Sequence, residues 1–144
     1  MILASPTFHH EQPIPLKFTC DGPDVSPELH ISDVPKDARS LALVMDDPDA
    51  PRGMFVHWVV WNIRPSTTTI GEGAVPGKQG RTDFGRVGYG GPCPPYGKHR
   101  YFFKLYALDT TLPLQEGSTK KDLETAMQGH IIARAELMGT YYRS

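Results

Sequence analysis

The chain has 144 residues, of which 39% are hydrophobic, and this is enough for one globular core. Lys and Arg number 15 against 16 Asp and Glu, so the formal net charge is -1. This balance excludes a long-range field that attracts nucleic acid or an anionic membrane, and any bound anion must be held locally. The apolar runs are far shorter than the roughly 20 residues that cross a bilayer, so no membrane span is predicted. We expect a single domain over residues 1–144.

The N-terminal residues MILASPTFHH contain neither a basic stretch nor a long apolar stretch. No secretion signal is therefore predicted, and the cytoplasm is the expected location. Two cysteines, Cys20 and Cys93, lie far apart, without the spacing of a CxxC motif or a metal knuckle. Because cytosolic thiols are usually reduced, two free thiols are favoured over a disulfide, although the spacing excludes neither state.

Most of the predicted elements in the first half are short strands, and they span 16–20 (LKFTC), 28–34 (ELHISDV), 40–46 (SLALVMD) and 56–63 (VHWVVWNI). The first two alternate and end at turn signals. The other two are continuous apolar runs, which are typical of strands buried on both faces. Within the last run, His57, Val59 and Trp61 are predicted to share one face.

The second half begins with a span from 64 to 95 that is rich in Gly, Thr and Pro, and long ordered loops of this kind often carry a site. A strand over 99–109 follows, with one face formed by His99, Tyr101, Phe103 and Leu105 and the other by Arg100, Phe102, Lys104 and Tyr106. One amphipathic helix is predicted to begin near Ser118 or Thr119, and 133–142 returns to strand-like alternation. Six or more strands and one helix indicate a β-sandwich or a barrel-like fold.

The motif DPDAP holds two carboxylates, Asp47 and Asp49, on a backbone stiffened by prolines. Asp-Pro pairs commonly start turns and bind local N–H groups, so a purely structural role is the simplest interpretation. His57 and His99 each open a strand, and Tyr101 follows two residues after His99. If both strands start at one edge of a sheet, these three side chains converge; for either histidine alone, a hydrogen-bonded structural residue is the simpler interpretation.

The segment GRVGYGGPCPPYGKH, residues 85–99, combines glycines that permit close backbone approach with prolines that remove N–H groups. The few remaining N–H groups are expected to stand at fixed places, where they can meet a ligand. The segment matches neither a dinucleotide-binding fingerprint nor a P-loop, because it contains no GxGxxG or GxxxxGK[ST].

DPDAP, the histidine that opens the next strand, and GYGGPCPPYGKHRYFFKLYALD together resemble the phosphatidylethanolamine-binding proteins (PEBPs), also called Raf kinase inhibitor proteins. The likeness is strongest to their short bacterial and archaeal branch, and FTCDGPDVSPEL and GHIIARAELMGTYYR extend it over nearly the whole chain. The resemblance implies a mainly β fold, a PEBP-like β-sandwich of two sheets with one or two short peripheral helices.

The resemblance also implies a small pocket at one edge that takes phosphate, a phosphorylated headgroup or a carboxylate. By motif position its residues are Asp47, Asp49, His57, Gly90, Gly91, Pro92, His99 and Tyr101. The implied role is a non-enzymatic binding or regulatory protein without a cofactor, with a kinase or a serine protease as the inhibited partner. Longer animal members carry a C-terminal helix that helps to close the pocket. This sequence stops at Ser144, so we expect no such helix and a homodimer instead.

Carboxylates beside an anion repel it unless neighbouring groups compensate. We expect Asp47 to keep His57 or His99 protonated, Tyr101 and the glycine-loop N–H groups to donate to the anion, and Asp49 to accept the ammonium group of a zwitterion such as phosphoethanolamine. One alternative is a hydrolase with Asp47 or Asp49 as base and a histidine as acid, although the sequence has no GxSxG motif. The other is a metal site formed by Asp47, Asp49, His57 and His99, although no HxxxH or HxH cluster is present.

Overall fold

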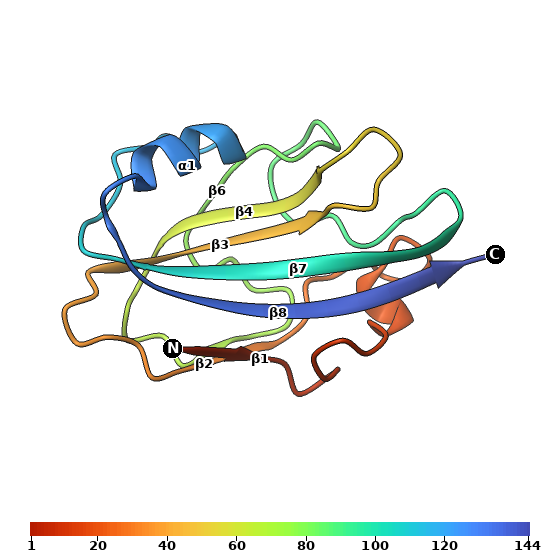
Figure 1. Ribbon diagram of the computed structural model, residues 1–144, viewed down its shortest axis with the longest axis horizontal. Coiled ribbons are helices and arrows are strands. Elements are labelled where there is room, and N and C mark those ends of the chain that lie inside the picture. The colour runs from red at the N-terminus through yellow and green to blue at the C-terminus, as the bar shows by residue number, and fades with distance from the viewer.

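The computed structural model describes residues 1–144 and contains two antiparallel sheets. Its elements are β1 (Ile2–Ala4), the 3-10 helix η1 (Leu16–Phe18), β2 (Leu29–Ser32), β3 (Ser40–Asp47), β4 (Phe55–Ile63), β5 (Thr69–Ile70), β6 (Lys78–Gln79), β7 (Gly97–Leu108), α1 (Lys120–Met127) and β8 (Ile131–Arg143). One sheet has the order β1-β2-β5 and the other β6-β4-β3-β7-β8, with the long strands side by side in Figure 1. The predicted mainly β sandwich of two sheets with a short peripheral helix is confirmed.

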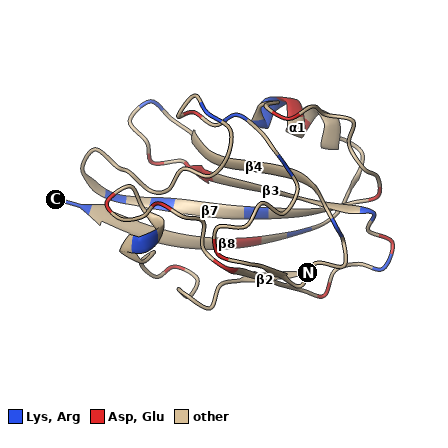
Figure 2. Cartoon of the chain, turned by 180° about the vertical axis from the view of Figure 1, so that it is seen from behind, with Lys and Arg blue, Asp and Glu red and all other residues tan.

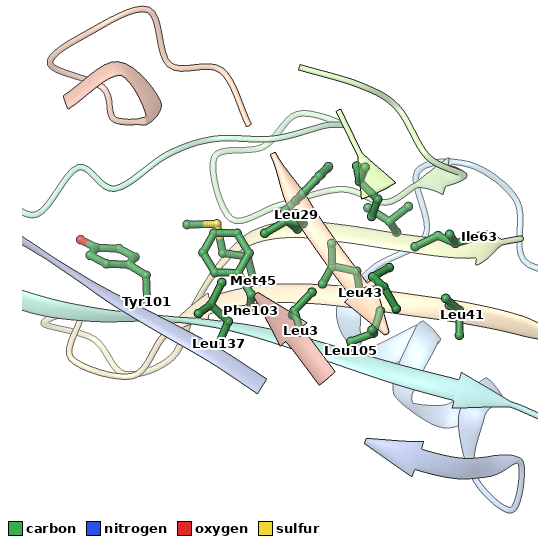
Figure 3. Packing of buried hydrophobic residues seen from close by; sticks show 14 of the residues in the cluster. Leu3, Leu29, Leu41, Leu43, Met45, Ile63, Tyr101, Phe103, Leu105 and Leu137 are labelled. Atoms are coloured by element: carbon green, nitrogen blue, oxygen red, sulfur yellow. The ribbon is translucent and has the colours of Figure 1, made fainter. Parts of the chain in front are cut away.

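The main hydrophobic core lies between the two sheets. It joins side chains of β1 and β2, such as Leu3 and Leu29, to alternate residues of the larger sheet. On β7 the predicted faces are confirmed, because Tyr101, Phe103 and Leu105 are fully buried in this cluster. Figure 3 shows Tyr101 at one end of the labelled side chains, with its hydroxyl pointing away from them. Each fully buried leucine or phenylalanine contributes about 1.5–3 kcal/mol to folding.

A second cluster lies between α1 and the outer face of the larger sheet, where Leu123 and Met127 of the helix pack with residues such as Val59. The helix begins after Thr119, as predicted. The Thr119 hydroxyl accepts a hydrogen bond from the Asp122 N–H, and the Asp122 carboxylate accepts one from the Thr119 N–H. This reciprocal pair satisfies backbone groups that would otherwise lack partners. No helix of the chain is long and apolar enough to span a membrane.

Two adjacent aspartates end β3 and face opposite sides of the sheet. Asp46 is fully buried on the side of α1, where the ammonium groups of Lys104 and Lys120 lie 3.1 and 2.9 Å from its carboxylate oxygens. Asp47 is buried on the side of the main core, beside His99. Because successive side chains of a strand alternate, one pair of neighbours carries a negative charge to both faces.

The segment 16–20 was predicted to be a strand, and this is wrong. Leu16–Phe18 forms a 3-10 turn after Pro15, and the Thr19 N–H and hydroxyl both donate to the Leu16 carbonyl, at 3.0 and 2.9 Å. Pro15 has a φ of -58°, which suits the start of a helical turn. The weak alternation misled the prediction because only Phe18 of this turn is buried, while Leu16 is 56% exposed.

Candidate functional site

A cavity of about 160 Å³ lies where β3 ends and where β4 and β7 begin. It is lined by Asp47, Ala50, Pro51, Phe55, His57, Phe84, Cys93, Pro94, Pro95, His99 and Tyr101. Because β3 runs antiparallel between β4 and β7, its last residues stand beside the first residues of both neighbours. The structure therefore brings together four of the residues expected in the pocket, Asp47, His57, His99 and Tyr101.

His57 reaches the cavity through a β-bulge. Met45 of β3 is paired with Trp58, and Asp46 is paired with Val56, so His57 is an extra residue in β4. A bulge of this kind turns two consecutive side chains to one side of the strand. His57 consequently lies edge-on to the Tyr101 ring, with centroids 5.2 Å apart. The prediction that it shares a face with Val59 and Trp61 is wrong, because those two residues belong to the cluster beneath α1.

Asp47 is paired with His99. Nδ1 of His99 donates to Oδ2 of Asp47 at 2.7 Å, and both side chains are almost fully buried. The other carboxylate oxygen of Asp47 accepts the Asp49 N–H at 2.7 Å, which is the local turn contact that Asp-Pro motifs favour. Asp47 thus has a structural and a site role at once. It fixes the His99 ring and leaves Nε2 as the ring nitrogen available to a ligand.

His57 is oriented by the backbone instead of a carboxylate. Its Nδ1 donates to the Gly90 carbonyl at 2.7 Å, again leaving Nε2 available. Burial among the rings of Phe55, Phe84 and Tyr101 lowers the pKa of His57 below its usual value, although the Gly90 carbonyl and Asp47 oppose this change. Of the two histidines expected as partners of Asp47, the structure selects His99, and His57 has no direct carboxylate partner.

The Tyr101 hydroxyl is a buried polar group without a hydrogen-bond partner. The residue is completely buried and lines the cavity. Burial, together with the charge of Asp47, raises the pKa of this hydroxyl well above its usual value, and the nearby Cys93 N–H opposes this change only weakly, so the hydroxyl stays a donor at every physiological pH. An unpaired buried hydroxyl costs about 1–3 kcal/mol, and such groups are rare in folded proteins.

The glycine loop supports the cavity from behind. The Gly90 N–H donates to the His57 carbonyl at 3.0 Å, and the Gly91 N–H donates to the Asp24 carboxylate at 2.8 Å. The prediction that these N–H groups are free to meet an anion is wrong. Both positions still require glycine, since a Cβ atom at Gly91 would collide with the carbonyl of Phe18. Of the expected loop residues, Gly90, Gly91 and Pro92 do not line the cavity, and the next three residues do.

Asp49 also lies outside the cavity wall. Its carboxylate accepts hydrogen bonds from Nε and Nη2 of Arg100, each at 2.9 Å, and this pairing lowers the pKa of the Asp49 carboxyl. The expected free carboxylate for an ammonium group is therefore already neutralised by a guanidinium. Sequence reasoning missed this partner because Arg100 was placed only on the outer face of its strand.

Cys20 and Cys93 form a disulfide, and this corrects the expectation of two free thiols. Their Cα atoms lie 5.4 Å apart, within the range that a disulfide bridges. Two surface elements meet here in space although 73 residues separate them in sequence. Arg143 at the end of β8 adds to this contact by donating to the Asp21 carboxylate at 2.9 Å and to the Pro94 carbonyl at 3.3 Å. The cavity wall at Cys93 and Pro94 is thus fastened from two sides.

The residues expected to form a hydrolase site or a metal site are partly separated in the structure. Asp49 is committed to Arg100, and no group of three or more His, Cys, Asp and Glu side chains is arranged to hold a metal ion. Among the cavity residues, the sulfur of Cys93 is held in the disulfide, and the only hydroxyl is that of Tyr101. The cavity combines two imidazole nitrogens and one phenol donor with a largely apolar wall. Such a set suits the recognition of a small anion.

The family model of the phosphatidylethanolamine-binding proteins matches residues 4–142 of this chain. A UPF0098 protein of Pyrococcus abyssi is 49% identical over 155 residues, covering 99% of this chain and 86% of that protein. A UPF0098 protein of Chlamydia muridarum is also 49% identical, over 98% of both chains.

Two solved structures are similar over almost their full length. A phosphatidylethanolamine-binding protein homologue from Chlamydia trachomatis has a TM-score of 0.96 and 48% identity, covering 99% of this chain and 97% of that chain. Escherichia coli YbcL, described as a member of the mammalian PEBP family, has a TM-score of 0.91 and 31% identity, covering 99% and 98%.

Proposed function

The chain belongs to the phosphatidylethanolamine-binding protein family, and we propose that its cavity binds a small anion, either a phosphate or phosphoryl headgroup or a carboxylate. The observation that carries the proposal is the unpartnered Tyr101 hydroxyl, which is buried at the cavity wall beside two histidines. A ligand oxygen at this place would accept its hydrogen bond and remove the cost of burying it unpaired. The cavity of about 160 Å³ has room for a headgroup and for little more.

The histidines make the proposed binding sensitive to pH. Nδ1 of both rings already donates its hydrogen, His99 to Asp47 and His57 to Gly90, so Nε2 of a neutral ring is only an acceptor. Beyond the hydrogen bond from Tyr101, a fully ionised anion therefore gains a hydrogen bond to a histidine only if Nε2 gains a proton, or if the anion itself carries one. In both cases the complex holds one proton more than the separated partners, and affinity falls as the pH rises.

Calorimetric titration with inorganic phosphate, phosphoethanolamine and acetate tests the proposal. We expect phosphate to bind, with an affinity that falls by up to about tenfold for each pH unit between about 6 and 8. His99→Gln should abolish most of this binding. The matched control is His130→Gln, because His130 also donates from Nδ1 to an aspartate, Asp109 at 2.8 Å, but is exposed and lies outside the cavity. No heat from any of the anions, or equal affinity in both variants, would overturn the proposal.

The proposal describes a binding protein and not an enzyme. A hydrolase based on the Asp47 and His99 pair remains the competing hypothesis, because a histidine oriented by a carboxylate is a common general base. Background rates with phosphoester, carboxyl ester and peptide substrates support the binding role. Turnover that disappears in His99→Gln but persists in His130→Gln would favour the hydrolase.

We also propose that the protein acts on a protein target, a kinase or a serine protease, as the family resemblance implies. The basis is the exposed rim beside the cavity, where Tyr96, Lys98 and Arg100 border a shallow groove. Inhibition assays with a panel of kinases and serine proteases test this part. Loss of inhibition in a Lys98→Glu variant that still binds phosphate would assign the effect to the rim.

The expected cytoplasmic location and the homodimer belong to the proposal as well. The Cys20–Cys93 disulfide is an argument against the cytoplasm, because disulfides are uncommon in reducing compartments outside some hyperthermophiles. Thiol labelling of the protein directly upon cell lysis decides the matter. Two labelled cysteines would indicate a reducing compartment, and none an oxidising one.

A further inference from the structure

The strand β8 forms one border of the five-stranded sheet. In Figure 1 it lies next to β7, on the side away from β3. Near its C-terminal end, the Glu11 N–H donates to the Met138 carbonyl at 2.6 Å, the Ile14 N–H donates to the Thr140 carbonyl at 2.7 Å, and the Thr140 N–H donates to the Gln12 carbonyl at 3.0 Å. Residues 11–14 thus occupy this edge from Met138 onward.

Residues 133–137 have no such hydrogen-bonded cover on this edge, although β1 packs close to β8. The pairing of β8 with β7 is regular from Ala133 to Arg143, and the first register shift lies between Ala133 and Ile131. Because backbone groups alternate sides along a strand, the N–H and C=O groups of Arg134 and Glu136 point the same way as those of Met138 and Thr140. They are hydrogen-bonded to no other segment of the chain. An unpaired edge of this kind is a template for another strand.

The charged side chains of residues 133–137 in one copy are complementary to those of the same residues in a second copy. Arg134 and Glu136 are exposed on one face, and neither belongs to any ion pair of the chain. Figure 2 shows basic and acidic colouring close together on β8. If two β8 strands pair antiparallel about a two-fold axis at Ala135, Arg134 of each copy faces Glu136 of the other. Ala135 then faces its own counterpart, where its small side chain permits close approach.

We propose that two copies of this protein associate through residues 133–137 of β8 and join their five-stranded sheets into one. The N–H and C=O groups of Arg134 in one copy bind those of Glu136 in the other, and the two-fold axis repeats the contact. The cavity stays open, because its residues His99 and Tyr101 pair with Tyr141 and Gly139, in the other half of β8. The inference rests on the proposed homodimer but not on the proposed ligand, so dimer formation and phosphate binding are measured separately.

Sedimentation equilibrium of the wild type and three variants tests the proposal. The contact is small, so we expect a dissociation constant on the order of micromolar, and the scan covers about 1 to 500 µM. Wild type should approach twice the 16.0 kDa chain mass. Arg134→Glu, which places like charges opposite one another, should weaken the dimer by about tenfold or more. The double variant with Arg134→Glu and Glu136→Arg should restore the dimer. Lys121→Glu on α1 changes the charge by the same amount outside the contact and serves as the control.

A cysteine at the axis gives a second measurement that does not depend on dimer strength. Directly opposed residues of a non-hydrogen-bonded antiparallel pair have Cα atoms about 4.5 Å apart, within disulfide range. Ala135→Cys should therefore form a covalent dimer on mild oxidation, whereas Lys121→Cys should not. A wild type that stays monomeric throughout the scan would overturn the proposal and leave the edge to an extended segment of another protein. A dimer that persists unchanged in Arg134→Glu, without crosslinking at Ala135→Cys, would place the interface elsewhere.

Discussion

Replacing Tyr101 by phenylalanine should stabilise the protein and at the same time weaken the binding of its proposed ligand. The substitution removes only the hydroxyl, which is buried and has no hydrogen-bond partner, and keeps the ring in the core. An unpaired buried polar group costs about 1–3 kcal/mol, so Tyr101→Phe should raise the free energy of unfolding by about 1 kcal/mol or more. For a chain of this length, this corresponds to about 3 °C or more in the melting temperature.

The same variant should lose affinity for phosphate. A hydrogen bond to a charged acceptor contributes about 1.5–3 kcal/mol, so phosphate should bind about tenfold to a hundredfold more weakly. Thermal unfolding without ligand and calorimetric titration with phosphate measure the two effects on the same samples. Tyr106→Phe is the control, because Tyr106 lies on the outer face of the same strand, half-buried, and does not line the cavity.

Opposite signs of the two effects are the signature of a hydroxyl that is reserved for a ligand. A Tyr101→Phe variant that is less stable than wild type by 1 kcal/mol or more would mean that the hydroxyl is satisfied inside the free protein. Unchanged phosphate affinity would mean that it does not contact the anion. Either result would refute the reasoning from the unpaired hydroxyl.

The remaining predictions concern stability. The pKa of His57 is lowered from 6.5 in the folded state, so the unfolded state binds more protons as the pH falls below about 6.5. The free energy of unfolding should therefore decline below this pH. Urea titrations from pH 7 to 5 should show a smaller decline for His57→Gln than for the wild type. Replacing Cys20 and Cys93 by serine removes a disulfide that joins residues 73 apart in sequence, and it should lower the free energy of unfolding in guanidinium by about 2–4 kcal/mol. A wild type that is equally stable with and without reductant would contradict a structural disulfide. Gly91→Ala should cost about 1–3 kcal/mol, because its Cβ meets the Phe18 carbonyl, and Gly71→Ala, with nothing within 4 Å, should be neutral in the same assay.

Strand positions and faces were predictable where the pattern is dense. In β7, an exposed or partly buried residue alternates with a buried one from Lys98 to Ala107, so the shared side of His99 and Tyr101 follows from the period of two. The start of α1 was predictable because the cap is local, with Thr119 and Asp122 satisfying each other's backbone groups. The convergence of His57 with His99 followed from the expectation that both strands start at one edge, and the order β4-β3-β7 meets that condition.

The features that the sequence pattern missed depend on pairing with distant residues. The bulge at His57 arises from the register between β3 and β4, which no property of the segment VHWVVWNI specifies. The Cys20–Cys93 disulfide and the Asp49–Arg100 ion pair each join segments that approach only in the folded chain. The glycine loop led to a wrong prediction because its close contact was assigned to a ligand. Glycine permits close approach, but the approaching group is the chain's own backbone at Phe18 instead of a ligand.

The two aspartates at the end of β3 have a consequence for strand alignment. A shift of β3 by one residue would exchange the faces of all its side chains, and the apolar run from Leu41 to Met45 resists such a shift only weakly. The aspartates remove this ambiguity, because a shifted strand would carry Asp46 away from Lys104 and Lys120, and Asp47 away from His99. Burying a carboxylate without its partner costs several kcal/mol. The two aspartates therefore favour one register of β3 over the shifted ones, and the pairing that fixes this register also sets His99 beside Asp47 at the cavity wall.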